Sequence, residues 1–401
     1  MKNNSFIKKK YPRVWLKSGR EKSVLNFHPW IFSGSILKQD SGCSEGDIVE
    51  VCTFGGDTLA YGHYSLKASI SCRIFHFGNI SGDFDEQYWF QKFSNAREAR
   101  IKFENPQTNA WRWIFAEGDN LPGLILDIYD DVAVIQARTT GMKNLLPTVT
   151  QWLQKQKIRH TLLKEEKGSS SQDIENEWIY GKKPLVSIIE NSLVFQVNVE
   201  NGQKTGFYLD QRENRALFRH YASNRDVLNV CCYSGAFSIY ALAGGAKSIV
   251  SVDISKNAIE QAKFNVDTYV NKNINTSLSC DYQVSDCFEW LKKMPENRYD
   301  LIVLDPPAFS KSQSSLMEAT RGYKEINMKA IRKIRPGGML FTFSCSQHIE
   351  KQLFQKIIFA AAADAKRTVR ILHQLHQAPD HPINIFHPEG EYLKGFVLEV
   401  Y

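Results

Sequence analysis

The sequence lacks hydrophobic runs suited to crossing a membrane. Its one long uncharged run, residues 227–246, contains Asn229, Tyr233, Ser234 and three glycines, so it is a poor membrane span. The first residues, MKNNSFIKKKYPR, include no apolar stretch of signal-peptide length, and we therefore expect no secretion. The eight cysteines follow no regular spacing, which indicates reduced thiols in a cytoplasmic protein rather than a disulfide framework.

Obvious internal repeats and long low-complexity tracts are also missing. The 401 residues exceed what one ordinary core accommodates, so two or three domains are expected. A composition of 43% hydrophobic and 23% charged residues is typical of a soluble globular protein. Lys and Arg number 50 against 43 Asp and Glu, a formal charge of +7. This excess suits a polyanionic partner, although a solvated basic surface explains it more simply.

Residues 1–77 alternate short β-rich segments with glycine-containing turns, a pattern typical of a small barrel or sandwich. Tyr11 and Trp15 are interleaved with basic residues in this block. Basic side chains can hold a nucleic-acid backbone while aromatic rings stack on bases. A charged face above core aromatics would contain the same residues, so both interpretations stay open. The basic residues are Lys8, Lys9, Lys10, Arg13, Lys17, Arg20 and Lys22.

Residues 78–184 mix helical and strand patterns. Helices are expected at 85–103 and 145–156, and strands within 124–137. Residues 164–177 are polar and predict a surface loop. We interpret the block as a compact α+β domain without a catalytic constellation of its own.

From residue 185 to 401, strand and helix patterns alternate regularly. Strands alternating with helices predict right-handed crossovers and a parallel sheet, which is an α/β, doubly wound, Rossmann-like domain. Its last predicted helix, residues 322–338, places apolar residues on one face. The expected strands are 226–232, 248–254, 282–286, 300–305 and 339–345.

Acidic residues finish three successive predicted strands, at the edge where such sheets bind ligands. Gly235 occupies the turn after the first strand, and Asp253 follows it by eighteen residues, a spacing suited to ribose hydroxyls. Asp286 and Asp305 end the next two strands. A single aspartate in such a place often only caps a helix, but three with a glycine turn predict a nucleoside cofactor.

The residues after Asp305 favour a cofactor other than NAD, which the strand-end pattern alone would allow. Pro306 and Pro307 prevent an immediate helix and leave an open turn. Phe309 follows closely, and a rigid acidic turn beside an aromatic ring suits the binding of a planar base.

Several segments together resemble the bacterial large-subunit ribosomal RNA cytosine-5 methyltransferases with an N-terminal PUA domain. The similarity spans nearly the whole chain, and several motifs in one order are more specific than any one of them. It implies a PUA domain over residues 1–77, a central α+β domain over 78–184, and a class I methyltransferase domain over 185–401 that uses S-adenosyl-L-methionine. The segments are KSGREKSVLNFHPWIFSGSI, EGDNLPGLILDIY, QKTGFYLDQR, DPPAFSKS, RGYKEINMKAI, FSCS and QAPDHPINIFHPEGEYLKGF.

The resemblance implies that Cys345, in the SCS motif, is the nucleophile that adds to carbon 6 of cytosine. Asp305 would hydrogen-bond the cytosine edge. Many other RNA cytosine-5 methyltransferases carry a second cysteine directly after the prolines, where this chain has Ala308. Methyltransferases that act on the exocyclic amines of bases place an aromatic residue directly after the prolines. In this chain Phe309 comes one residue later. Both departures fit a one-cysteine enzyme and leave the base that removes the carbon-5 proton unidentified.

The remaining expected site residues divide into two sets. The cofactor-binding set is Lys204, Thr205, Tyr208, Asn229, Cys231, Gly235, Asp253, Ile254, Asp286, Cys287 and Asp305. The substrate-binding set is Pro306, Pro307, Phe309, Lys311, Arg321 and Lys324. His373, His376, His381 and His387 are close in sequence but lack a paired cysteine or a helical H-x-x-x-H, so no metal is expected.

The expected partner is large-subunit ribosomal RNA, without a membrane, and a homodimer stays open. Two other functions also stay open. The chain could methylate another RNA base position on the same scaffold, or be a non-catalytic RNA-binding factor in ribosome assembly.

Overall fold

The computed structural model describes residues 11–165, 176–273, 278–309 and 315–401. Lys311, an expected substrate-binding residue, lies outside these ranges. The chain forms two compact units. Unit 1 comprises residues 1–186, 198–206 and 379–390, and unit 2 comprises 187–197, 207–378 and 391–401. The structure groups residues 198–206 and 379–390 with unit 1. The division into the continuous blocks 1–77, 78–184 and 185–401 stays a prediction.

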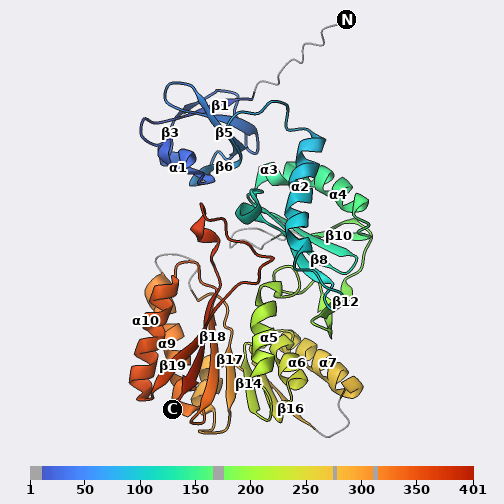
Figure 1. The fold of residues 1–401 in the computed structure, drawn as a ribbon, viewed down its shortest axis with the longest axis vertical. Coiled ribbons are helices and arrows are strands. Elements are labelled where there is room, and N and C mark those ends of the chain that lie inside the picture. Colours follow the sequence, from blue (N-terminus) through green and yellow to red (C-terminus); the bar gives the residue numbers. More distant parts are fainter. Residues whose placement is uncertain (1–10, 166–175, 274–277, 310–314) are drawn as a thin grey trace, which may run out of the picture. The chain divides into compact units, whose positions relative to one another are not determined.

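Unit 1 begins with a six-stranded sheet, β2-β6-β5-β4-β1-β3 (Figure 1). Alternate residues of β1 are buried, which is the pattern of a strand with one face in the core. The β-rich fold expected for the first block is thereby confirmed. Its elements are β1 Arg13–Leu16, α1 Lys22–Leu25, β2 Trp30–Phe32, η1 Ser33–Ser35, β3 Ile36–Gln39, β4 Ile48–Cys52, β5 Thr58–Tyr64 and β6 Ile70–Phe77.

A five-stranded sheet, β11-β10-β9-β8-β7, forms the rest of unit 1. Every residue of β8 and β9 is buried, so these two strands form its centre. Asp85 caps α2 by accepting a hydrogen bond from the amide of Tyr88. The elements are α2 Glu86–Ile101, β7 Ala110–Phe115, η2 Ala116–Asp119, β8 Leu124–Tyr129, β9 Val132–Ala137, α3 Thr140–Asn144, α4 Leu146–Lys155, β10 His160–Leu163 and β11 Glu177–Tyr180.

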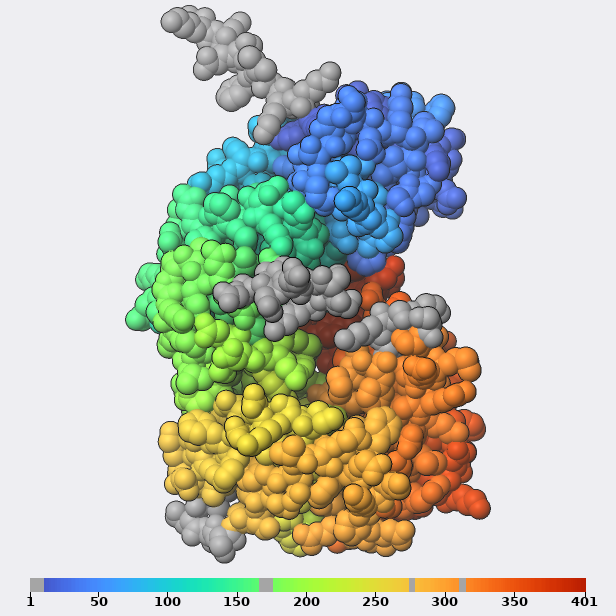
Figure 2. All heavy atoms as spheres, turned by 180° about the vertical axis from the view of Figure 1, so that it is seen from behind, coloured from blue at the N-terminus to red at the C-terminus, as the bar shows by residue number. Residues whose placement is uncertain are grey.

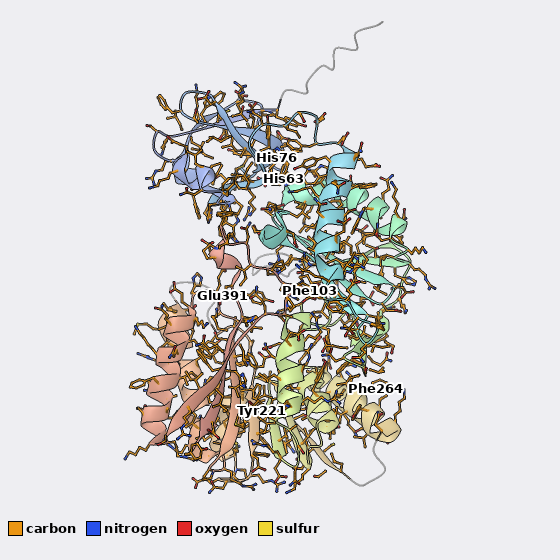
Figure 3. All side chains as sticks on the ribbon, viewed as in Figure 1. His63, His76, Phe103, Tyr221, Phe264 and Glu391 are labelled. Atoms are coloured by element: carbon orange, nitrogen blue, oxygen red, sulfur yellow. The ribbon has the colours of Figure 1, made fainter. Side chains whose placement is uncertain are left out.

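Aromatic rings from both sheets fill a shared core in unit 1. His63 of β5 and His76 of β6, both labelled in Figure 3, pack against aromatic rings of this core. The His63 ring is 4.9 Å from Phe75 and 5.9 Å from Trp89, measured between ring centroids. Burial lowers the pKa of His63 to about 4, because charging an imidazole away from water is unfavourable. His63 is therefore neutral in the folded protein at pH 7.

Unit 2 is built on a seven-stranded sheet, β16-β15-β14-β17-β18-β20-β19. The first five strands in this order run parallel, whereas β20 is antiparallel to both β18 and β19. The expected doubly wound α/β fold is confirmed, and β19 and β20, which the sequence pattern did not predict, extend it. The elements are η3 Leu209–Gln211, α5 Arg212–His220, β14 Asp226–Val230, α6 Ala236–Ala243, β15 Ser248–Asp253, α7 Lys256–Asn273, β16 Ser279–Val284, α8 Cys287–Lys293, β17 Leu301–Leu304, α9 Leu316–Lys333, β18 Gly338–Ser344, α10 Lys351–Ala365, β19 Val369–His376 and β20 Lys394–Val400.

The strand order of this sheet reverses at β14. The next strand along the chain, β15, pairs with one side of β14, and β17 pairs with the other. The crossovers therefore diverge above the carboxyl ends of β14 and β17, and such a switch point is where open α/β sheets bind ligands. A two-stranded sheet of β12 Leu185–Glu190 and β13 Leu193–Asn198 precedes the large one.

Helices cover the large sheet, and α9 shows why the helical pattern was readable. Its apolar positions Tyr323, Ile326, Ala330 and Ile331 are all buried, together with the following Ile334. Residues coloured yellow to orange in Figure 2, which include α7, α8 and α9, form the surface of unit 2 in that view. Over the described ranges, no helix combines the length and apolar character needed to cross a membrane. The 3₁₀ turn η5, Pro388–Gly390, belongs to unit 1.

Candidate active site

The carboxyl ends of five neighbouring parallel strands of unit 2 carry the predicted site residues. Cys231 follows β14, Asp253 ends β15, and Asp286 comes shortly after β16. Asp305 follows β17, and Cys345 follows β18. Because these strands are adjacent and parallel, their ends lie along one edge of the sheet, as the sequence predicted.

The turn between β14 and α6 depends on Gly235. Its φ of 78° lies in the left-handed region, and Cys231 and Tyr233 also have positive φ values of 60° and 46°. A Cβ atom on Gly235 would stand 3.0 Å from the Cβ of Ala262 in α7. Gly235 therefore permits both the turn and the close approach of α7 to the start of α6.

Asp253 has the chemistry expected of a ribose-binding residue. Its carboxylate accepts hydrogen bonds from the amides of Tyr233 and Ser255, each at 2.9 Å. A carboxylate has about four acceptor sites, so capacity for a pair of ribose hydroxyls remains. The adjoining Ile254 is 70% exposed and presents an apolar surface suited to covering an adenine ring. The turn, the carboxylate and this side chain together fit an adenosine-containing cofactor.

Asp286 acts as a helix cap. Its Oδ1 accepts hydrogen bonds from the amides of Phe288 and Glu289, at 2.9 Å and 3.2 Å, at the start of α8. Asp286 therefore has the helix-capping role that a single aspartate at a strand end often has. A cofactor contact by Asp286 stays a prediction.

Two thiols meet at the same edge. The side chains of Cys231 and Cys287 hydrogen-bond to each other. This interaction raises the pKa of Cys231, with burial adding to the effect, and it lowers the pKa of Cys287. Cys231 follows β14 and Cys287 begins α8, and the contact of either residue with the cofactor stays a prediction.

Asp305 is held by a residue that the sequence analysis missed. The Nε2 of Gln211 donates to Oδ2 of Asp305 at 3.0 Å. Asn214 in turn donates to Oε1 of Gln211 at 2.6 Å and to the carbonyl of His376 at 3.1 Å. Gln211 and Asn214 are both buried. Gln211 lies in the motif segment QKTGFYLDQR, which was the available signal for it.

Cys345 is the half-exposed residue between two buried serines, Ser344 and Ser346. Its thiol donates to the carbonyl oxygen of Pro306 at 3.9 Å, so it lies against the turn that begins with Asp305. The hydroxyls of Tyr323 and Ser346 are 3.0 Å apart. The thiol of Cys345 thus contacts the loop that begins with Asp305, the other predicted catalytic residue.

Two tyrosines and a lysine interact electrostatically with Cys345. Burial, with a smaller effect of Cys345, raises the pKa of Tyr323 to about 12. Burial also raises the pKa of Tyr208, to which Asp305 and Asp210 contribute before Cys345. Lys394 is buried in β20 and was not predicted as a site residue. Both tyrosines are therefore neutral near pH 7.

The predicted substrate-binding residues lie in different surroundings. Pro306 is buried and Pro307 is exposed. The Phe309 ring packs 4.6 Å from Tyr323 and 5.7 Å from Phe288, measured between ring centroids. Arg321 is exposed, and Lys324 forms an ion pair with Asp364 at 2.7 Å. Their contact with a substrate stays a prediction.

Three expected cofactor residues make other contacts. Asn229 is buried and donates to Ser238 at 2.9 Å, within the core beneath the edge. In unit 1, Lys204 is exposed with a φ of 47°, while Thr205 is buried and bonds to Asp127 at 2.5 Å. Tyr129 is also 2.9 Å from Thr205. The cofactor roles of these residues stay predictions.

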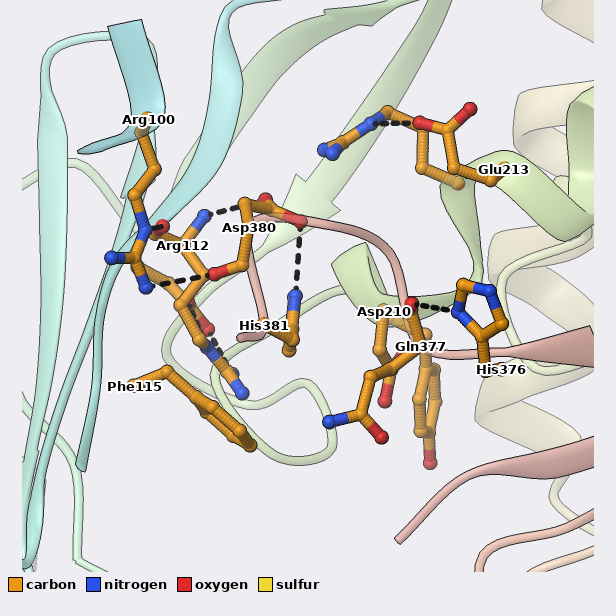
Figure 4. Close-up of polar contacts among 12 residues, drawn as sticks. Arg100, Arg112, Phe115, Asp210, Glu213, His376, Gln377, Asp380 and His381 are labelled. Atoms are coloured by element: carbon orange, nitrogen blue, oxygen red, sulfur yellow. Dashed lines mark hydrogen bonds and ion pairs between the residues drawn. The ribbon is translucent and has the colours of Figure 1, made fainter. Parts of the chain in front are cut away.

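The four histidines near the carboxyl end have protein partners. In unit 1, His381 contacts Asp380 at 3.0 Å, and Figure 4 shows Asp380 between His381 and Arg112. His387 packs 4.4 Å from Trp30 between ring centroids. In unit 2, His373 contacts Tyr221 at 2.7 Å, and His376 contacts the carbonyl of Gln377 at 2.8 Å. Within the part of the chain that the structure describes, no three His, Cys, Asp or Glu residues gather as a metal site.

Comparison with protein families gives two matches. Residues 124–385 match the S-adenosylmethionine-dependent methyltransferase family, and residues 14–77 match a PUA-like domain. The first match covers most of the chain and includes the ends of all five parallel strands.

Curated relatives extend over almost the whole chain. One is named ribosomal RNA large subunit methyltransferase I, from Pseudoalteromonas atlantica, and is 40% identical over 397 residues, covering 97% of this chain and 99% of its own. A relative of the same name from Alteromonas mediterranea is 38% identical over 396 residues, covering 97% and 98%.

Solved structures share the fold. A protein described as "A putative sam-dependent methyltransferase from Streptococcus mutans" superimposes with a TM-score of 0.82 at 19% identity, covering 96% of this chain and 99% of that one. A second structure, of a methyltransferase complexed with SAH, gives the same values. At this identity the likeness establishes the fold.

Proposed function

The chain belongs to the S-adenosylmethionine-dependent methyltransferase family, and from that premise we propose that it methylates large-subunit ribosomal RNA to form 5-methylcytosine. The ribosomal substrate is inferred from relatives that are 38% and 40% identical over nearly their full length. The base and the position on it are inferred from Cys345 and Asp305. Action in the cytoplasm and assembly as a homodimer stay predictions.

S-adenosyl-L-methionine supplies an electrophilic methyl group on its sulfonium. Asp253 would bind the ribose hydroxyls, and Ile254 would cover the adenine. The turn containing Gly235 would bring backbone amides close to the cofactor. Asp286 and Cys287, at the amino end of α8, would complete the wall.

Cys345 would activate the base. Carbon 5 of cytosine is a weak nucleophile until a group adds to carbon 6. The Cys345 thiolate would form a bond to carbon 6, which moves electron density to carbon 5. Carbon 5 then takes the methyl group. Loss of the carbon-5 proton and expulsion of the thiolate restore the aromatic ring and release the enzyme.

Asp305 would position the base and stabilise charge on the ring. The hydrogen bond from Gln211 to Oδ2 fixes the orientation of this carboxylate. The Phe309 ring lies after the same turn and packs 4.6 Å from the buried Tyr323, measured between ring centroids, which orders this aromatic side chain. The observation that carries the proposal is the contact of the Cys345 thiol with the carbonyl of Pro306, directly after Asp305.

The test is transfer of a labelled methyl group to ribosomal RNA, followed by nucleoside analysis of the product. We expect 5-methylcytosine from the wild-type protein and none from Cys345→Ala, with binding of S-adenosylhomocysteine retained. Cys280→Ala is the matched control, since it removes a partly buried thiol of β16 that belongs to neither set of expected site residues, and it should still form 5-methylcytosine.

Three other results would each reject part of the proposal. Full activity of Cys345→Ala would exclude it as the nucleophile. A different methylated base in the product would reject the cytosine assignment. Cofactor binding without turnover on any RNA would indicate a non-catalytic assembly factor.

A further inference from the structure

We propose that Lys394 is a positioning residue for Cys345, holding a positive charge beside residues 344–346 so that the thiol ionises more readily. The inference rests on the proposed function, in which Cys345 attacks as a thiolate. It assigns a role to a buried lysine in a strand that the sequence pattern did not predict.

The pairing of two strands places Lys394 beside the nucleophile segment. β20 runs antiparallel to β18, and Lys394 lies opposite Ser344 in the register. The Nζ of Lys394 donates to the carbonyl oxygen of Ser346 at 2.8 Å. Because Cys345 separates these two serines, the ammonium is fixed at one backbone carbonyl of the segment that carries the thiol.

Burial makes this charge effective. Lys394 is only 3% exposed, so little water screens its interaction with neighbouring groups. Burial lowers the pKa of Lys394 to about 8, while the charges of Cys345, Glu391 and Glu350 act in the opposite direction. At pH 7 the lysine therefore stays mainly protonated.

Among the residues that the structure describes, the two tyrosines that interact with Cys345 do not supply a positive charge. Tyr208 and Tyr323 interact with Cys345 but are neutral near pH 7, because their pKa values are raised. Asp305, which follows β17, is an anion in the proposed mechanism and opposes thiolate formation. Lys394, as a cation, contributes an interaction that favours the ionised thiol.

A lysine elsewhere in the chain provides a matched control. Lys164 is also buried, and its Nζ donates to the carbonyls of Val199, at 2.9 Å, and Gly202. Burial lowers its pKa to about 8 as well, with no thiol among the causes. Replacing Lys164 therefore removes an equally buried charge without removing one beside Cys345.

The test measures the rate at which iodoacetamide alkylates Cys345 as a function of pH, followed by mass spectrometry of the peptide that contains it. Lys394→Gln removes the charge but keeps a donor for the carbonyl of Ser346. We expect it to raise the apparent pKa of Cys345 and to slow alkylation at pH 7 about 10-fold. Lys394→Arg should restore most of the rate, and Lys164→Gln should leave the profile unchanged.

Coincident pH profiles of the wild-type protein and folded Lys394→Gln would overturn the inference, as would an equal shift in Lys164→Gln. If Lys394→Gln does not fold, Lys394→Arg becomes the test. This variant keeps the positive charge, so a pH profile of alkylation that differs from that of the wild type would also reject the inference. Alkylation needs no RNA, so this readout is independent of the proposed substrate. A shifted profile in a protein that forms no 5-methylcytosine would reject the proposed function and leave the electrostatic role of Lys394 intact.

Discussion

The amide of Gln211 donates to Asp305 from nitrogen, because its oxygen already accepts a hydrogen bond from Asn214. The first bond measures 3.0 Å and the second 2.6 Å. Asn214 is itself fixed to the backbone carbonyl of His376. If the Gln211 amide were flipped, its oxygen would face the Asp305 carboxylate and its nitrogen would face the side-chain nitrogen of Asn214. This chain of hydrogen bonds therefore selects one orientation of the amide and holds Asp305 as an acceptor.

Replacement of Gln211 should impair catalysis more than cofactor binding. Gln211→Ala removes one hydrogen bond to a charged group, which is worth about 1.5–3 kcal/mol. We expect kcat for methyl transfer to fall about 10-fold or more, with the Kd for S-adenosylhomocysteine changed less than threefold. The control is Gln374→Ala, an exposed glutamine of unit 2. Parallel losses in kcat and cofactor affinity would mean that Gln211 maintains the cofactor site instead.

Two glycines separate the effects of backbone conformation and of crowding. Gly235→Ala places a Cβ in a left-handed conformation and 3.0 Å from Ala262. Gly337→Ala has a similar φ of 76° but nothing within 4 Å. We expect Gly337→Ala to lower the free energy of unfolding by about 1–2 kcal/mol. Gly235→Ala should lower it further and weaken S-adenosylhomocysteine binding. Urea titration and calorimetry measure both, and equal effects of the two changes would contradict the crowding argument.

A buried ion pair anchors the start of unit 2. Arg215 in α5 makes two bonds to Glu190, at 2.8 Å and 2.7 Å, and both side chains are buried. Arg215→Met leaves an uncompensated buried carboxylate, and we expect a loss of about 3–5 kcal/mol in the free energy of unfolding. The double change Arg215→Met with Glu190→Leu should recover much of it. A double variant no more stable than Arg215→Met would contradict the argument that the unpaired buried carboxylate causes the loss.

Acidification should destabilise the protein partly through His63. Its folded pKa of about 4 is below the ordinary value of 6.5, so the unfolded chain binds more protons between these pH values. The stabilising contribution is therefore complete above pH 6.5 and is lost as the pH falls towards 4. Between pH 7.5 and 5 we expect a loss of about 2 kcal/mol from this residue.

Urea unfolding of the wild-type protein and of His63→Leu over this pH range measures the contribution. The variant should lose less stability on acidification, whatever its stability at pH 7.5. His220→Leu, at an exposed site, is the control and should follow the wild-type slope. A His63→Leu slope equal to that of the wild type would show that folding does not lower the pKa of His63.

Local sequence patterns sufficed for the parallel half of unit 2. Strand and helix periods predicted β14 to β18 and the buried face of α9, and strand ends then placed Asp253, Asp305 and Cys345 on one edge. These features depend on neighbouring residues along the chain, since the direction of a strand determines which residue ends at the ligand edge.

Gln211 and Lys394 were not predictable in the same way. The bond from Gln211 to Asp305 joins residues 94 positions apart, and that from Lys394 to Ser346 spans 48 positions. Lys394 also opens a strand as a buried charged residue, which is rare and breaks the apolar strand pattern. Both roles arise from tertiary pairing, which no short window of sequence contains.

The assignment of residues 198–206 and 379–390 to unit 1 has a consequence for how such a chain can change. Unit 1 uses Thr205 as a partner for Asp127, and the carbonyl of Asp380 as a partner for Arg100. A single recombination junction after residue 186 would remove both of these partners from unit 1. A single junction therefore cannot exchange either unit intact between homologues, because each unit is built from separate segments of the chain.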